Sequence, residues 1–170
     1  MYETLLEEAR LCGLKVIEKY PFLSSRIRGL CCDDTIALSA QIDTEAERTV
    51  ILCEELTHAT HTVGDILQDP RAERRIRERI FDRLIGLDGL VEASLSGCRE
   101  PWEFAEHFGV PQDFFIEAMQ NYRERHGTLA KIATRHGLFA LSFEPTLRVR
   151  QIKRASNKTR LKGDLTGDAV

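Results

Sequence analysis

Residues 44–61 read TEAERTVILCEELTHATH, and this stretch predicts the helix around which the rest of the fold is arranged. Thr44, followed three residues later by Glu47, forms the capping-box pattern that begins many helices. Apolar side chains then recur at helical spacing, so we expect one helix from this cap to about His61.

The chain before this helix predicts one further helix and a hairpin. Residues 27–40 have the pattern of two short strands that turn at Asp33-Asp34, because aspartates favour turns. Over residues 3–19, small and apolar side chains recur at helical spacing and Pro21 ends the pattern, which predicts a single helix. The side chains that carry this pattern are Leu6, Ala9, Gly13, Val16 and Ile17.

The chain after residue 61 predicts more helices, a second hairpin and a tail. The fold class is therefore expected to be α+β, mainly helical with a small antiparallel β-sheet or hairpin. We expect helices at 71–84, 87–95, 101–108 and 111–125, a hairpin at 138–152 turning at Glu144-Pro145-Thr146, and disorder beyond Lys153. The expected parts are a core at 1–86, a helix-turn-helix-like unit at 87–126, a β-hairpin at 127–152 and a basic tail at 153–170.

Composition and charge limit the classes of function. The 170 residues are 42% hydrophobic and 30% charged, which suits one domain with a real core. The net charge of -3 divides into about -8 over residues 1–147 and +5 over 148–170, so the chain as a whole is not a polycation made for nucleic acid. No apolar run approaches the ~20 residues needed to cross a bilayer, and no signal-peptide pattern is present, so we expect a cytoplasmic protein. Five cysteines without a Cys-x-x-Cys pair predict reduced, mostly buried thiols.

Residues 54–58 carry the strongest chemical signal. Glu54 and His58 are one helical turn apart on one face, so both can reach a single ion. Glu55 lies about 100° around the helix axis, where it can hold and deprotonate a metal-bound water. This is the geometry of the zinc motif H-E-x-x-H, with Glu54 in the position of the first histidine. A solvated helix face is the alternative interpretation.

Glu73 is the candidate for a third ligand, which a zinc site of this type takes from another element. It heads the apolar stripe of the basic helix at 71–84, where a carboxylate is costly to bury without a partner. A metal ion is one good partner. A salt bridge from Glu73 to Arg74 or Arg77 is the alternative.

Several segments, taken together, resemble one protein family. The stretch ILCEELTH at 51–58 is similar to the ImmA/IrrE family of metallopeptidases, above all to members found in phages and integrated mobile elements of Gram-positive bacteria. Four more segments resemble that family in the same order along the chain, and the resemblance extends over most of residues 1–145. These segments are LCCDDTIAL at 30–38, TVGDIL at 62–67, the arginine-rich helix at 71–85 and the helical stretch at 104–122.

The resemblance implies a zincin-like core and a zinc-dependent endopeptidase. Such enzymes often cleave a helix-turn-helix repressor and thereby release a mobile element, so the implied partner is a repressor and the implied role that of a prophage anti-repressor. The resemblance makes Glu55 the general base, and Glu54, His58 and Glu73 the metal ligands. Zn²⁺ is the implied cofactor, although the oxygen ligands also suit another divalent metal.

Glu54 changes the charge of such a site. A set of two histidines and one glutamate leaves a divalent ion with one net positive charge, whereas Glu54, His58 and Glu73 neutralise it. A neutralised ion acidifies its bound water less. A catalytically inactive relative that binds a repressor is therefore the first alternative function.

His61 offers an alternative ligand pair, in which His58 and His61 hold the ion. Glu54 and His61 are about 10.5 Å apart along the helix axis, so one ion does not easily take both.

The helices at 101–108 and 111–125 also have the order of a helix-turn-helix, which makes a DNA-binding regulator the second alternative. Asp113 and Glu117 on the second helix, with Glu103 and Glu106 on the first, oppose contact with phosphates. Direct DNA binding is therefore not expected. We expect the large apolar side chains of this unit to be core: Trp102, Phe104, Phe108, Phe114, Phe115 and Met119.

Overall fold

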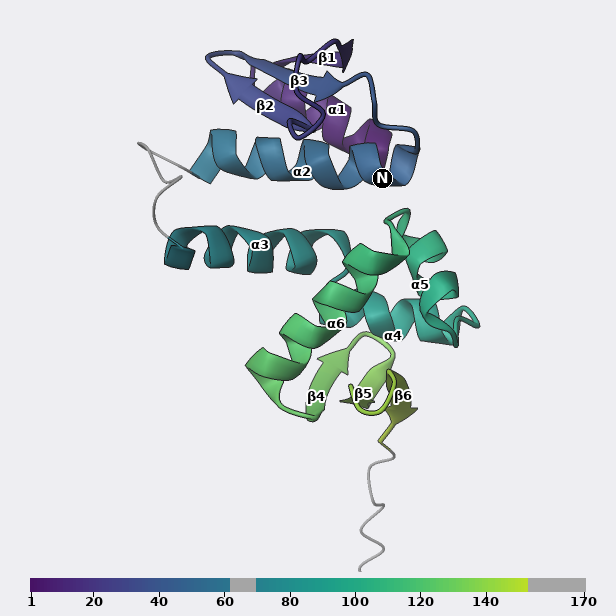
Figure 1. Cartoon of the computed structure of the whole chain (residues 1–170). Coiled ribbons are helices and arrows are strands. Elements are labelled where there is room, and N and C mark those ends of the chain that lie inside the picture. Colours follow the sequence, from purple (N-terminus) through teal and green to yellow (C-terminus); the bar gives the residue numbers. More distant parts are fainter. Residues whose placement is uncertain (62–69, 153–170) are drawn as a thin grey trace, which may run out of the picture.

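Residues 1–61 and 70–152 are described by the computed structural model, and they form two small β-sheets with helices between them (Figure 1). The sheets lie at opposite ends of the molecule, and about half of the described residues are helical. The predicted α+β class is confirmed at this level.

The N-terminal sheet has the strand order β1-β3-β2, where β1 is Lys15–Tyr20, β2 is Gly29–Cys32 and β3 is Thr35–Ser39. β1 runs parallel to β3, and β2 runs antiparallel to it as the predicted hairpin. Asp33 begins the turn at φ 52°, in the left-handed region that aspartate tolerates better than most residues. β2 is therefore an edge strand of this sheet.

The single helix predicted over residues 3–19 is wrong beyond residue 11. Helix α1 spans Tyr2–Leu11, and Lys15–Tyr20 forms β1 instead. Gly13 takes φ 77°, a left-handed conformation that glycine adopts at little cost and that ends the helix. Val16 and Ile17 then pair with β3, because β-branched side chains suit a strand once a partner strand is present.

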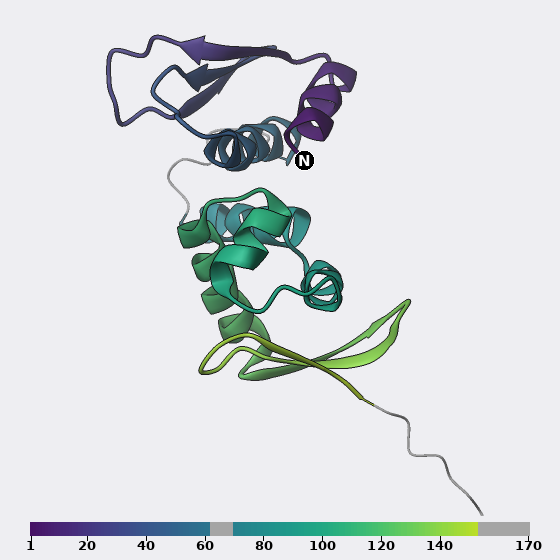
Figure 2. The same cartoon turned by 90° about the vertical axis from the view of Figure 1, so that its right-hand side faces the viewer.

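Helix α2 (Glu45–His61) begins at the predicted capping box and lies at the centre of the N-terminal half. The N–H of Glu47 donates to Thr44 Oγ1 at 3.1 Å, and the N–H of Thr44 donates to Glu47 Oε2 at 3.3 Å. α1 and α2 cover one face of the first sheet, and α3 (Pro70–Leu84) runs alongside α2 on the side away from the sheet (Figures 1 and 2). α2 is thus held between a sheet and a second helix.

Three helices and a second sheet complete the described chain. The helices α4 (Leu87–Leu95), α5 (Pro101–Phe108) and α6 (Gln112–His126) agree closely with the prediction. The expected hairpin at 127–152 is instead a three-stranded antiparallel sheet, because the strand β4 precedes it. The sequence LAKIAT of β4 alternates too weakly to reveal a strand. The strands of this sheet are β4 (Leu129–Thr134), β5 (Gly137–Ser142) and β6 (Arg148–Gln151).

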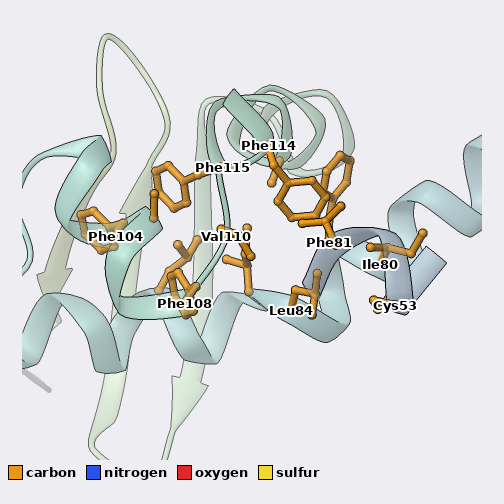
Figure 3. Packing of buried hydrophobic residues seen from close by; sticks show 14 of the residues in the cluster. Cys53, Ile80, Phe81, Leu84, Phe104, Phe108, Val110, Phe114 and Phe115 are labelled. Atoms are coloured by element: carbon orange, nitrogen blue, oxygen red, sulfur yellow. The ribbon is translucent and has the colours of Figure 1, made fainter. Parts of the chain in front are cut away.

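One hydrophobic cluster connects the two halves of the fold (Figure 3). Phe81 of α3 packs on Phe114 of α6 with ring centroids 5.1 Å apart, and Phe104 stacks on Phe115 at 5.4 Å. Phe104, Phe108, Phe114 and Phe115 are core, as predicted, and Met119 is partly buried against them. Trp102 differs from the prediction, because it lies on the outer side of α5 and is 55% exposed.

Three further expectations concern termini, membranes and thiols. The tail predicted at 153–170 lies outside the described residues.

Among the residues that the structure describes, no helix has the length and hydrophobicity to cross a membrane. All five cysteines are free, as expected, but the prediction that most are buried is wrong, since only Cys53 is fully buried.

Candidate functional site

Glu55 lies on the face of α2 that packs against the edge strand β2. The backbone N–H of Cys31 interacts with its carboxylate, and a Cβ placed on Gly29 would lie 2.8 Å from Glu55 Oε1. The same Cβ would lie 2.6 Å from Ile51 Cγ2, well inside van der Waals contact. β2 therefore approaches α2 this closely only because residue 29 lacks a side chain.

The electrostatic environment of Glu55 is that of a half-buried acid. Burial raises the pKa of Glu55 above its ordinary value, while the charge of His58 and the N–H of Cys31 act in the opposite direction. A carboxyl group whose pKa is raised above its ordinary value holds a proton more readily, which suits it to accept and return one.

Glu54 is ion-paired with Arg77 of α3. Arg77 also binds Glu117 of α6 through two hydrogen bonds, with Nε–Oε1 at 3.0 Å and Nη2–Oε2 at 2.6 Å. Its guanidinium lies 5.2 Å from the ring centroid of Phe81 and 5.0 Å from that of Phe114. Arg77 therefore connects α2, α3 and α6 at one point.

Glu73 lies in the first turn of α3, and its Oε1 atom is buried. This oxygen has no hydrogen-bond partner among the described residues. Arg74 and Arg77, the salt-bridge partners that the sequence offered, both bind other carboxylates. The proposed salt bridge is therefore absent from the described part of the chain, and a buried carboxylate oxygen without a partner is costly.

The Glu54–Arg77 pair sets the register between α2 and α3, which run antiparallel (Figure 1). One turn further along α2 is His58, and one turn back along α3 is Glu73, a step of about 6 Å on each helix. The turns that carry His58 and Glu73 therefore face each other. His58 is half-buried at this position.

The predicted site residues are thus brought to one helix pair but not into a complete ligand set. Across residues 1–61 and 70–152, no three His, Cys, Asp or Glu side chains are arranged to hold one metal ion. Glu54 is directed to Arg77 rather than shared with His58 and Glu73. α2 ends at His61, whose side chain lies outside the described part of the chain, so the His58–His61 pair stays a prediction.

Two features of this site were not predicted from the sequence. Arg77 was considered only as a partner of Glu73, one helical turn away, whereas it binds Glu54 of another helix. Gly29 stands inside a strand pattern, and an isolated glycine there is a known signal of close backbone approach.

A cleft of about 270 Å³ lies beside Glu54, between α2, α3 and α6. Its lining is rich in charge: Arg28, Glu47, Glu54, Arg77, Asp113 and Glu117. A larger groove of about 540 Å³ lies on the first sheet and its connecting loop, and its lining is mostly apolar, including Phe22, Leu23 and Leu30. Ionisable chemistry is therefore concentrated in the first cleft, and apolar contact surface in the second.

Comparison of the chain with models of known protein families, with curated proteins and with solved structures finds no match.

Proposed function

We propose that this protein is a metal-dependent endopeptidase of the kind found in the ImmA/IrrE family, acting on a helix-turn-helix repressor. The observation that carries the proposal is the buried, unpartnered Oε1 of Glu73, on the turn of α3 that faces His58 of α2. An imidazole and a carboxylate on facing helices are donors that a divalent transition metal accepts, and a cation would satisfy the buried oxygen.

In this proposal the metal ligands and the general base are separate residues. His58 and Glu73 would hold the cation, with Glu54 as the third donor, and the oxygen-rich set suits zinc or manganese. The cation supplies a Lewis acid that polarises the scissile carbonyl and acidifies water. Glu55, held between Gly29 and Cys31, takes a proton from the attacking water and returns it to the leaving amine.

The edge strand β2 supports a peptide as the substrate. Edge strands present unpaired backbone groups to which an extended peptide can add. A peptide placed along β2 would pass Glu55, which interacts with the N–H of Cys31. The neighbouring residues Leu30 and Cys32 line the apolar groove, so we expect apolar side chains near the cleavage site.

The ion pair between Glu54 and Arg77 favours a second candidate, a relative that binds a repressor without cleaving it. In that protein Arg77 would occupy the first ligand position permanently, and His58 and Glu73 would not suffice for hydrolysis.

The experiment is incubation of the protein with a candidate helix-turn-helix repressor in the presence of Zn²⁺ or Mn²⁺, with any fragments identified by mass spectrometry. Glu55→Gln should lower the rate by about a hundredfold or more, the usual contribution of a general base. Glu45→Gln, an exposed change in the first turn of α2, is the matched control and should leave the rate unchanged. Equal rates in wild type and Glu55→Gln would contradict the assignment of the base. Binding of the repressor without cleavage would establish the second candidate.

A further inference from the structure

We infer that Arg77 is a positioning residue that offsets the charge of Glu54, so that the Glu54–Arg77 pair takes the place of the neutral first histidine of an H-E-x-x-H site. This inference rests on the metal site proposed above. It explains how a carboxylate, Glu54, can stand at the first ligand position of that site.

Arg77 is held in front of Glu54 by contacts that do not depend on Glu54. Glu117 binds its guanidinium through two atoms, at 3.0 and 2.6 Å, a bidentate geometry that fixes the plane of the group. Phe81 and Phe114 both lie about 5 Å from the guanidinium carbon, which adds cation–π attraction. The positive charge therefore stays beside residue 54 whether or not a cation is bound.

The interaction between Arg77 and Glu54 takes place partly out of water. The side chains are 32% and 29% exposed, so the pair is less screened than an ordinary surface salt bridge. Arginine also remains protonated in proteins at all working pH values. The compensation of the Glu54 charge is thus permanent.

The charge count of the site then changes. A divalent ion held by His58 and Glu73 keeps one net positive charge, and Glu54 alone would cancel it. Arg77 restores that charge, so the surroundings of the ion become electrically equivalent to those of a histidine-led site. Arg77 should accordingly weaken cation binding while keeping the ion electrophilic.

A purely structural role for Arg77 is the competing interpretation, and Arg74 is the matched control for it. Arg74 also lies on α3 and also binds a glutamate of α6, with Nη2–Oε2 to Glu124 at 2.9 Å. Its hydrogen bonds among the described residues go to Glu78 and Glu124, not to Glu54. A helix-tying role is therefore shared by both arginines, whereas charge compensation belongs to Arg77.

The test measures the affinity of the full chain for Zn²⁺ by competition with a chromophoric chelator. Arg77→Gln should bind Zn²⁺ about tenfold more tightly than wild type, because a nearby positive charge is lost. Arg74→Gln should stay within about twofold of wild type, since among the described residues Arg74 pairs with Glu78 and Glu124 rather than with Glu54. Arg77→Lys keeps a positive charge but loses the bidentate contact with Glu117, so its Zn²⁺ affinity should lie between those of wild type and Arg77→Gln.

A double-mutant cycle tests whether Arg77 acts through Glu54. In a Glu54→His background, Arg77→Gln should tighten Zn²⁺ binding at least threefold less than it does in wild type. If Arg77→Gln fails to fold in a thermal melt, Arg77→Met keeps apolar contact with Phe81 and Phe114 without the charge and should give the same tightening.

Each outcome supports or overturns the inference. Tightening confined to Arg77→Gln or Arg77→Met supports it, including the case in which only these variants bind Zn²⁺. Zn²⁺ binding by wild type, with equal affinity in the Arg77 and Arg74 variants, overturns the inference and leaves the metal site in place. Absence of Zn²⁺ binding in wild type and in every variant overturns both the inference and the proposed metal-dependent function.

Discussion

Gly29 of β2 and Glu55 of α2 are in such close contact that a methyl group on Gly29 would stand 2.8 Å from the Glu55 carboxylate. The relationship joins an edge strand to the candidate base across the interface of sheet and helix. Because residue 29 lacks a side chain, β2 can lie close against α2. The backbone of β2 then contacts the Glu55 carboxylate and holds it in place.

Gly29→Ala should therefore destabilise the protein by about 1–3 kcal/mol, the usual cost of forcing one methyl group into a packed interface. The closest clash is with Ile51 Cγ2, which cannot rotate away as freely as the end of Glu55 can. Thermal melts of the variant and of Gly29→Ala/Ile51→Ala measure the effect. The double variant should lose less than the sum of the two single changes, and simple additivity would show that the two residues do not collide.

Glu73→Leu should raise the melting temperature of the metal-free protein by a few degrees, because it removes a buried carboxylate oxygen that lacks a partner. Added Zn²⁺ should then raise the melting temperature of wild type and leave that of the variant unchanged. Glu45→Leu changes an exposed first-turn glutamate of α2 and should give no such gain. A variant less stable than wild type in chelator would mean that the Glu73 carboxylate is already satisfied.

Glu47 should make the cap of α2 sensitive to acid. Burial alone would raise the pKa of Glu47, but hydrogen bonds from Arg28 and Thr44 outweigh it and lower the pKa below the ordinary value. A lowered folded-state pKa means that its stabilisation is present above the ordinary pKa of glutamate and is lost as pH falls through the lowered value.

The measurement is the melting temperature of wild type and of Glu47→Gln between about pH 3 and pH 7. At neutral pH the difference should correspond to the loss of one capping contact, about 1 kcal/mol. The gap between the two proteins should be widest at neutral pH and should close toward pH 3. Glu45→Gln removes a charge from the same turn and serves as the control. A difference in melting temperature that widens on acidification would contradict a lowered pKa of Glu47 in the folded protein.

Cys53 should resist alkylation in the folded protein. Burial raises the pKa of its thiol to about 11, so the thiolate is scarce at pH 8 and also enclosed by the core. Cys12 and Cys32 are exposed and should react with iodoacetamide first. Mass spectrometry of native and urea-unfolded samples separates the three sites. Labelling of native Cys53 at the rate of Cys12 would show that α2 opens readily from its neighbours.

Local patterns in the sequence were enough to predict most elements. The Thr44–Glu47 capping box, the Asp33-Asp34 turn and the apolar periodicity of α3 to α6 are properties of neighbouring residues, and each is satisfied in the fold. The spacing of Glu54, Glu55 and His58 likewise followed from helical geometry alone. These features do not require knowledge of what lies across the core.

Tertiary structure decided the features that depend on distant partners. Val16 and Ile17 became strand rather than helix because β3, some twenty residues later, offers a ladder to pair with. Glu54 forms an ion pair with Arg77, and Arg77 forms one with Glu117, only because the packing of α2, α3 and α6 brings those charges together. Periodicity shows which residues share a face of one helix, whereas which charge meets that face is determined by the packing of several elements at once.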